Sequence, residues 1–196
     1  MRLAAIALTA LLALPFAGHA AELGDDGLHK ADWMQDTFKD LPEDLAEATA
    51  DGKRLLVMVE QRGCIYCSKM HAEVYPVPEI DAMLRDDYFV VQINMFGDIE
   101  VTDFDGEVMT EKQLVRKWGL LFTPTLVFFP EEVAQPAPGS ELAVAQIPGA
   151  FGASTTRDLL TWVLEKGYKS DEPFQTYHAR MHNARVAEGE ENQDSN

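Results

Sequence analysis

The stretch that decides the fold is Leu55-Leu56-Val57-Met58-Val59-Glu60-Gln61-Arg62-Gly63-Cys64-Ile65-Tyr66-Cys67. It holds the only two cysteines of the chain, with two residues between them. The apolar run before them has no polar face, which predicts a central parallel strand over 53–59. The residues after Cys67 show helical spacing up to Pro76, which cannot continue a helix. The cysteine pair therefore lies where a buried strand passes into a helix.

The spacing of the two cysteines predicts redox chemistry. Thiols at this spacing on the first turn of a helix can close a small disulfide and reopen it. We predict that Cys64 is the exposed nucleophile, because the helix N-terminus and the nearby cation of Arg62 stabilise its thiolate. Cys67 shares a stripe with Met70, His71 and Val74, so we predict that it is the sheltered thiol. An inert structural disulfide is the alternative, and the tiny loop makes it a poor staple.

Residues 1–20 have the pattern of an export signal. Met1-Arg2 precedes an uncharged apolar run to Ala17, and Gly18-His19-Ala20 supplies small residues for cleavage. The alternative is a membrane anchor, but the run is shorter than the roughly 20 residues that a spanning helix needs. We therefore expect cleavage after Ala20 and a periplasmic protein.

The charge of the chain excludes some partners. The formal charge is −17, and removal of Arg2 with the signal changes it to about −18. Such an acidic protein does not bind nucleic acid or an anionic membrane through bulk charge. The mature chain is long enough to fold on its core alone. Its two cysteines are therefore expected to be catalytic, although exported proteins more often use cysteines as structural staples.

The chain is expected to form one α/β domain with extensions at both ends. Residues 21–30 show no period and suggest a loose lead-in, and Asp40 and Glu43 have the spacing of a capping box for a short helix. We expect an N-terminal extension over 21–52, a central domain over 53–168 and a C-terminal extension over 169–196, disordered from Glu188 onward. The remaining expected elements are helices from Pro78, over 110–118, 154–166 and 174–186, and strands over 88–94, 122–129 and 142–147.

An inserted segment, 95–110, is expected to form a solvated hairpin around Asp105-Gly106. Its acidic residues suggest calcium, but the spacing of a calcium loop would place Val101 first and Lys112 twelfth, where acidic ligands are needed.

Two motifs together resemble the thioredoxin superfamily. The first is Cys64-Ile65-Tyr66-Cys67 after a buried strand, which is typical of a thioredoxin-like redox motif. The second is Thr123-Pro124-Thr125 at the start of another apolar strand, where a proline is tolerated. The resemblance covers about 53–166. It implies a thioredoxin fold, with a central mixed β-sheet flanked by helices.

Three segments show a narrower resemblance to the SoxW-type periplasmic thioredoxins. These segments are 60–71 (EQRGCIYCSKMH), 98–106 (DIEVTDFDG) and 123–129 (TPTLVFF). That family is associated with sulfur oxidation and is thought to carry electrons from a membrane thiol transporter to periplasmic disulfides. The resemblance implies a monomeric reductant of protein disulfides that needs no cofactor beyond the Cys64–Cys67 pair.

The resemblance assigns roles to residues around the pair. Pro124 is expected to be cis and to leave the Thr123 backbone free to pair with a partner, while Ile65, Tyr66 and Gly149 frame the same groove. The buried Asp of ordinary thioredoxins falls at Met58 here, and the usual Trp before the first cysteine is Gly63. Glu60 is therefore the nearest candidate base for the sheltered thiol, with bulk water as the alternative.

Other functions remain open from the sequence. The same pair could act as a disulfide oxidase or isomerase, because direction depends on reduction potential. Cys64, Cys67 and His71 could bind copper or zinc in a metallochaperone, although no fourth ligand is evident. His178 and His182 form a weak metal pair on the tail helix, where a solvated face is the simpler interpretation. An adaptor protein with an inert disulfide is the last alternative.

Overall fold

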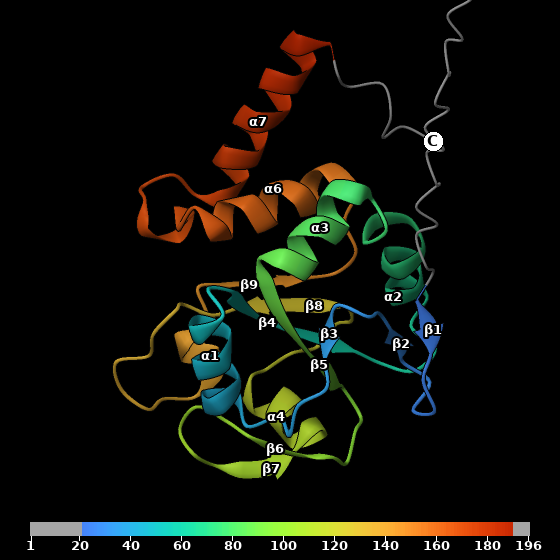
Figure 1. Cartoon of the computed structure of the whole chain (residues 1–196), viewed down its shortest axis with the longest axis vertical. Helices are drawn as coiled ribbons and strands as arrows, with labels where there is room; N and C mark the ends of the chain where they lie inside the picture. The colour runs from blue at the N-terminus through green and yellow to red at the C-terminus, as the bar shows by residue number, and fades with distance from the viewer. Residues whose placement is uncertain (1–20, 190–196) are drawn as a thin grey trace, which may run out of the picture.

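The structure, a computed structural model, describes residues 21–189. The expected signal at 1–20 and the end of the tail at 190–196 lie outside the described residues. The described chain forms a central sheet covered by helices on both faces (Figure 1). None of its helices is long and apolar enough to cross a membrane.

Five strands form the central sheet in the order β3-β5-β4-β8-β9. The strands β3, β5 and β4 are parallel, while β8 runs antiparallel to both β4 and β9, so the sheet is mixed as predicted. Two strand pairs lie outside it, β1 with β2 and β6 with β7. The strands are β1 (Glu22–Leu23), β2 (His29–Lys30), β3 (Met34–Gln35), β4 (Arg54–Glu60), β5 (Tyr88–Asn94), β6 (Glu100–Thr102), β7 (Val108–Thr110), β8 (Thr125–Phe128) and β9 (Ala145–Pro148).

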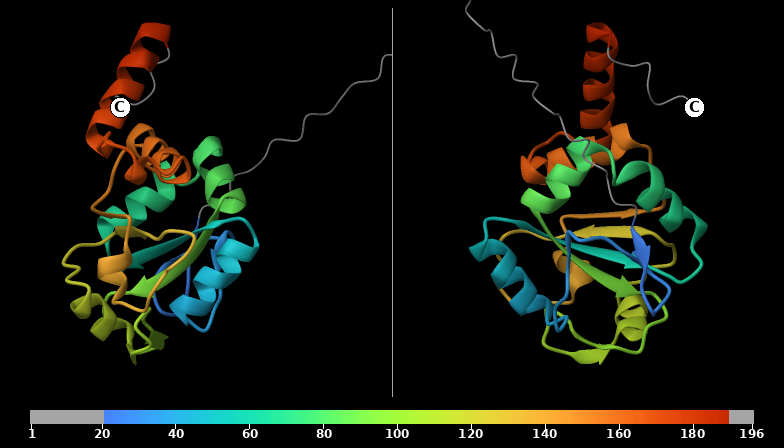
Figure 2. Two further views of the ribbon diagram at one scale, coloured as in Figure 1. Left: turned by 90° about the vertical axis from the view of Figure 1, so that its left-hand side faces the viewer. Right: turned by 45° about the vertical axis from the view of Figure 1, so that its right-hand side comes forward.

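The helices divide between the two faces of the sheet, as Figures 1 and 2 show. One core lies between the sheet and α1 and α4, and the other between the sheet and α2, η1, α3 and α6. The helices are α1 (Leu41–Ala50), α2 (Ile65–Lys69), the π-helix η1 (Met70–Val74), α3 (Pro78–Asp86), α4 (Glu111–Lys117), α5 (Gly139–Leu142), α6 (Ala153–Leu164), the 3-10 helix η2 (Gly167–Lys169) and α7 (Phe174–Glu188).

Strand β4 contributes side chains to both cores. Every residue of β4 is buried, because β5 and β8 pair with its two edges and helices cover both faces. Leu55, Val57 and Val59 face the α1 side, and Leu56 and Met58 face the α2 side. Since side chains alternate along a strand, Glu60 at its end points to the same side as Met58.

The N-terminal segment is more ordered than its sequence suggests. The expectation of a loose lead-in over 21–30 is wrong, because β1 and β2 pair as a small antiparallel ladder. Strand β3 then joins the central sheet beside β5. Strands of two residues are too short to show an alternating pattern, and their pairing depends on distant partners. Helix α1 begins as predicted at Asp40, whose side chain accepts from the Glu43 N–H at 3.2 Å.

Two further expectations need correction. The strand expected over 142–147 exists as β9 but begins only at Ala145, because Gly139–Leu142 forms the short helix α5 before the chain reaches the edge of β8. The hairpin of the insertion exists but is not simply solvated, because Val101, Phe104 and Met109 are buried in the core beneath α1 and α4. The buried Asp103 accepts from the indole N–H of Trp118 at 3.2 Å and fixes the hairpin there.

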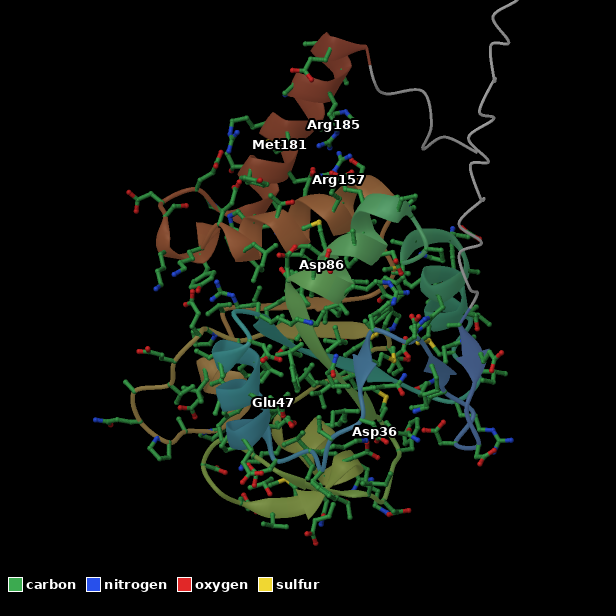
Figure 3. The ribbon with its side chains drawn as sticks, in the orientation of Figure 1. Asp36, Glu47, Asp86, Arg157, Met181 and Arg185 are labelled. Carbon is green, nitrogen blue, oxygen red and sulfur yellow. A yellow bond between two sulfur atoms is a disulfide. The ribbon has the colours of Figure 1, made fainter. Side chains whose placement is uncertain are left out.

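The C-terminal extension contains α7, which projects away from the body of the protein (Figure 2). The buried carboxylate of Asp158 on α6 holds it, accepting from Arg185 at 2.9 Å and lying 2.6 Å from Nδ1 of His178. Figure 3 shows Arg157 and Arg185 at this junction of α6 and α7. Thr155 lies 3.2 Å from the other ring nitrogen of His178, so both nitrogens of this residue contact the protein.

Candidate active site

The two cysteines form a disulfide at the start of α2, with their Cα atoms 5.2 Å apart. Cys64 is the N-cap of the helix, and its Sγ accepts from the Cys67 backbone N–H at 3.0 Å. The expectation that Cys64 is exposed is wrong, because both cysteines are buried, with 7% of Cys64 and 1% of Cys67 exposed. Cys64 is nevertheless the more exposed of the two residues, and its sulfur receives the hydrogen bond that favours a thiolate.

The segment before β8 packs against this sulfur. The peptide bond between Thr123 and Pro124 is cis, as the resemblance implied. The Thr123 hydroxyl lies 3.4 Å from Sγ of Cys64, and the Thr123 carbonyl oxygen lies 3.5 Å from it. The N–H of Gly149, a residue with φ of 104°, donates to the Pro124 carbonyl at 2.8 Å. The structure therefore brings Thr123, Pro124 and Gly149 to the edge where Cys64 lies.

Exposed apolar side chains surround the pair. Ile65 is 73% exposed and Tyr66 is 58% exposed, directly after Cys64. Leu121 and Phe122, at 78% and 64% exposure, precede Thr123. Large apolar side chains left in solvent on both sides of a reactive pair are typical of a surface that binds a partner. Leu121 and Phe122 are not among the predicted site residues, although their position directly before the Thr-Pro-Thr motif is a signal that could have pointed to them.

Arg62 is exposed two residues before the pair. Its aliphatic side chain lies against Gly27, where an added Cβ would come within 2.8 Å of Cγ of Arg62. The β1–β2 segment thus contacts the loop that enters the active site, so it can help to fix the direction of the Arg62 side chain.

Glu60 is buried behind the pair at the end of β4, with 1% exposure. Both of its oxygens face Nε2 of the buried His71, at 3.0 and 3.2 Å. Gln92 of β5 donates to Oε2 at 2.7 Å. Glu60 therefore belongs to a buried polar cluster on the face of the sheet that α2 and η1 cover.

Two residues of the N-terminal segment complete this cluster. The ring of His29 stacks on His71 with centroids 4.8 Å apart, and its Nε2 lies 2.9 Å from Oγ of Ser68. The ring of Trp33 stacks on His71 from 6.3 Å. Burial lowers the pKa of His29, and the neighbouring His71 acts in the same direction. His29 carried no local sequence signal, whereas Gln92 was a polar residue in an otherwise apolar run.

The residues suggested as metal ligands do not come together. Nε2 of His71 contacts the carboxylate of Glu60, and Nδ1 of His178 contacts the carboxylate of Asp158. Across residues 21–189, no group of three or more His, Cys, Asp and Glu side chains is arranged to hold a metal ion.

The fold and the disulfide define a class of proteins with a thioredoxin-like oxidoreductase fold and a pair of cysteines at C-x-x-C spacing. The family model described as "Thioredoxin-like domain" matches residues 41–160, so the chain belongs to the thioredoxin-like family. A search of curated proteins found no match.

Solved structures show the same fold. A thioredoxin-fold protein from Helicobacter pylori is 16% identical with a TM-score of 0.52, and 68% of this chain and 87% of that one are covered. A thioredoxin from Thermus thermophilus is 23% identical with a TM-score of 0.51, with coverage of 65% and 86%. At these identities the similarity supports the fold alone.

Proposed function

We propose that this protein is a periplasmic thiol–disulfide oxidoreductase that reduces disulfides in other proteins. The observation that carries the proposal is the Cys64–Cys67 disulfide at the start of α2, with the Thr123 backbone and exposed apolar side chains beside it. A structural disulfide has no need of such surroundings. A redox pair needs one accessible sulfur, one sheltered sulfur and a surface that holds the partner.

The reaction uses the two thiols of the reduced protein in turn. The Cys64 thiolate attacks one sulfur of the partner disulfide, which forms a mixed disulfide and releases the other partner sulfur as a thiolate. Cys67 loses its proton and attacks Sγ of Cys64. This second attack restores the Cys64–Cys67 disulfide and releases the second partner sulfur. Two electrons pass to the partner, whose two thiolates take up protons from solvent.

In this proposal the residues around Cys64 bind the partner protein. An extended segment of the partner can pair with the backbone at Thr123, as peptides do when they add to the edge of a sheet. Ile65 and Tyr66 on one side, and Gly149 beside Pro124 on the other, frame this segment. We place Glu60 as the group that accepts the proton of Cys67, since Met58 offers no polar atom on that face of β4.

The direction of electron flow and the location rest on the sequence. The pattern of residues 1–20 supports export, and the three segments that resemble SoxW-type thioredoxins support a reductant in a sulfur-oxidation context. After each turnover the Cys64–Cys67 disulfide of such a reductant must be reduced again. A membrane thiol–disulfide transporter is the class of partner that can supply electrons to it in the periplasm. The substrates are then periplasmic proteins that carry disulfides.

The deciding experiment traps thiols in living cells with an alkylating reagent added after acid quenching. We expect Cys64 and Cys67 to be mainly reduced, and the purified protein to reduce the disulfides of insulin. A pair that is mainly oxidised in cells would instead indicate an oxidase, and a reduced pair that reshuffles disulfides without net reduction of insulin would indicate an isomerase. A pair that stays oxidised even with excess dithiothreitol would exclude any redox role.

A further inference from the structure

The N-terminal segment, residues 21–35, lies beside the first turn of the active-site helix (Figure 1). It contacts the chain on both sides of the cysteine pair. Before the pair, Gly27 lies against the side chain of Arg62, so that an added Cβ at Gly27 would come within 2.8 Å of Cγ. After the pair, Nε2 of His29 lies 2.9 Å from Oγ of Ser68. The active-site turn is therefore held by a segment that lies more than thirty positions earlier in the chain.

The contact of His29 continues through Ser68 to the backbone of Cys64. The Ser68 hydroxyl donates to the Cys64 carbonyl at 3.2 Å, and the Ser68 N–H donates to the same oxygen at 3.0 Å. Cys64 is the N-cap of α2, and the Cys67 N–H donates to its sulfur at 3.0 Å. One hydroxyl thus links a side chain of the N-terminal segment to the turn that presents the reactive sulfur.

These hydrogen bonds indicate which nitrogen of His29 carries the proton. Ser68 has one hydroxyl proton, and this proton goes to the Cys64 carbonyl. The Ser68 oxygen must then accept from His29, so Nε2 is the protonated nitrogen. Nδ1 is buried and has no hydrogen-bond partner, which suits an unprotonated nitrogen, because an N–H group there would lack an acceptor. The neutral ring with its proton on Nε2 is the form that fits the structure.

His29 is itself anchored at two points. Its ring stacks on the buried ring of His71, with centroids 4.8 Å apart, and its carbonyl oxygen accepts from Gln92 at 2.8 Å. The side chain of the next residue, Lys30, donates to the same Gln92 at 2.6 Å. Because both its ring and its backbone are held, His29 presents Nε2 to Ser68 in a defined position.

His29 remains neutral at pH 7. Burial lowers its pKa, and His71 acts in the same direction, while smaller effects of Glu60 and of the Ala21 backbone oppose them. His71 and Glu60 are the titratable side chains that act on this ring. A neutral imidazole keeps one proton, so the donor to Ser68 is present at every pH above the pKa of His29.

We propose that His29 is a positioning residue for Cys64, which it reaches through Ser68. In the oxidised protein the disulfide holds the first turn of α2 closed. After reduction that bond is gone, and the hydrogen bonds from His29 to the Cys64 carbonyl keep the turn closed in its place, since donors in a chain strengthen one another. The Cys67 N–H then stays on the Cys64 sulfur and favours its thiolate. The inference rests on the proposed function, in which Cys64 is the nucleophile.

The test is alkylation of the reduced full chain by iodoacetamide over a range of pH, read at Cys64 by fragmentation mass spectrometry. The midpoint of the pH profile reports how readily Cys64 loses its proton, and the plateau at high pH reports access to the sulfur. His29→Phe keeps an aromatic ring on His71 but loses the donor. We expect its midpoint at higher pH and its plateau unchanged. The contact with Ser68 is exposed to solvent, so water replaces part of the lost bond, and the rate at pH 7 should fall about threefold.

Two further variants show whether the effect passes through Ser68. His29→Gln keeps an N–H donor in place of Nε2 and should restore the wild-type profile. Ser68→Ala removes the middle of the link and should shift the midpoint as His29→Phe does. The double variant should shift it no further, because both changes remove the same link. Ser68 is exposed, so Ser68→Ala also serves if His29→Phe does not fold.

The proposal is overturned if His29→Phe and Ser68→Ala leave the midpoint unchanged, or if their shifts add in the double variant. A lower plateau with an unchanged midpoint would also overturn it, because that result reports altered access to the sulfur. Alkylation needs no partner protein. A wild-type protein that fails to reduce insulin would therefore count against the proposed function and not against this role of His29.

Discussion

The hydroxyl of Thr123 lies 3.4 Å from Sγ of Cys64, although 59 positions separate the two residues in the chain. The contact joins the segment before β8 to the first turn of α2. In the disulfide the sulfur can only accept, so the hydroxyl donates to it. After reduction the same hydroxyl is placed to donate to the Cys64 thiolate.

Replacing Thr123 by Val should make Cys64 less reactive. The variant keeps the branched shape but loses the donor, and a hydrogen bond worth about 1 kcal/mol corresponds to about a fivefold loss of reactive thiolate. The rate of Cys64 alkylation by iodoacetamide at pH 7 measures the effect. Thr123→Ser keeps the hydroxyl and should react like the wild type. Equal rates for Val and Ser would show that the hydroxyl does not act on the sulfur.

The two cysteines should behave differently when one of them is replaced. Cys67→Ser should accumulate a covalent complex with a disulfide-bearing protein such as insulin, because Cys64 still attacks and nothing resolves the product. Cys64→Ser should form none, since Cys67 is only 1% exposed. Non-reducing electrophoresis measures the complexes. Comparable complexes with both variants would mean that the nucleophile is assigned wrongly.

Asp103 should be essential for holding the inserted hairpin. Its carboxylate is fully buried and accepts from the Gly139 N–H at 2.9 Å and from Trp118 at 3.2 Å. Asp103→Ala leaves these donors unpaired, so we expect a loss of about 2–4 kcal/mol in the free energy of unfolding, measured in urea. Asp105→Asn removes a more exposed acid of the same turn and should cost below about 1 kcal/mol. Similar losses would contradict a special role of Asp103.

Glu131 should stabilise the fold in a pH-dependent way. It pairs with Lys166 at 2.6 Å and with the buried Arg54 at 2.9 Å. The hydrogen bond from Lys166, with a further one from Arg54, lowers the pKa of Glu131 to about 2. Its contribution is therefore complete above the unfolded value of about 4.5 and is lost as the pH falls toward 2.

Glu131→Gln should lower the free energy of unfolding by about 1–2 kcal/mol at pH 7, since partial exposure weakens the ion pairs. The difference from the wild type should narrow as the pH falls from 4.5 to 2. The exposed neighbour Glu132 provides the matched control, and Glu132→Gln should change little at any pH. A difference that persists unchanged at pH 2.5 would rule out the ion pairs as its cause.

The local elements around the cysteines could be predicted closely from the sequence. Strand β4 was expected over 53–59 and is found at Arg54–Glu60, and α1 begins at the predicted cap, Asp40. Apolar runs, caps and prolines act over a few residues, so they leave a readable pattern. The helix after Cys67 was expected to be regular, but it changes to the π-helix η1 at Met70.

Elements that depend on distant partners could not be predicted in this way. Strand β3 exists because β5 offers its free edge, and the burial of Val101 and Phe104 depends on α1 and α4 lying above them. The sequence close to these positions does not indicate which distant strand or helix will pack against them. The same reason explains why the strand expected over 142–147 begins only at Ala145, where it pairs with β8.

The sequence by itself determined where the cysteine pair lies in the fold. The spacing of Cys64 and Cys67 after a buried strand, with Thr123-Pro124 before another, was sufficient to predict the thioredoxin fold and the position of the disulfide. Only the tertiary structure decided what lies behind them. The sheet register brings Glu60 beside Gln92, and the N-terminal segment lays His29 over His71. Such contacts join residues from separate strands and a helix, and the packing of those elements, not local spacing, sets which side chains meet.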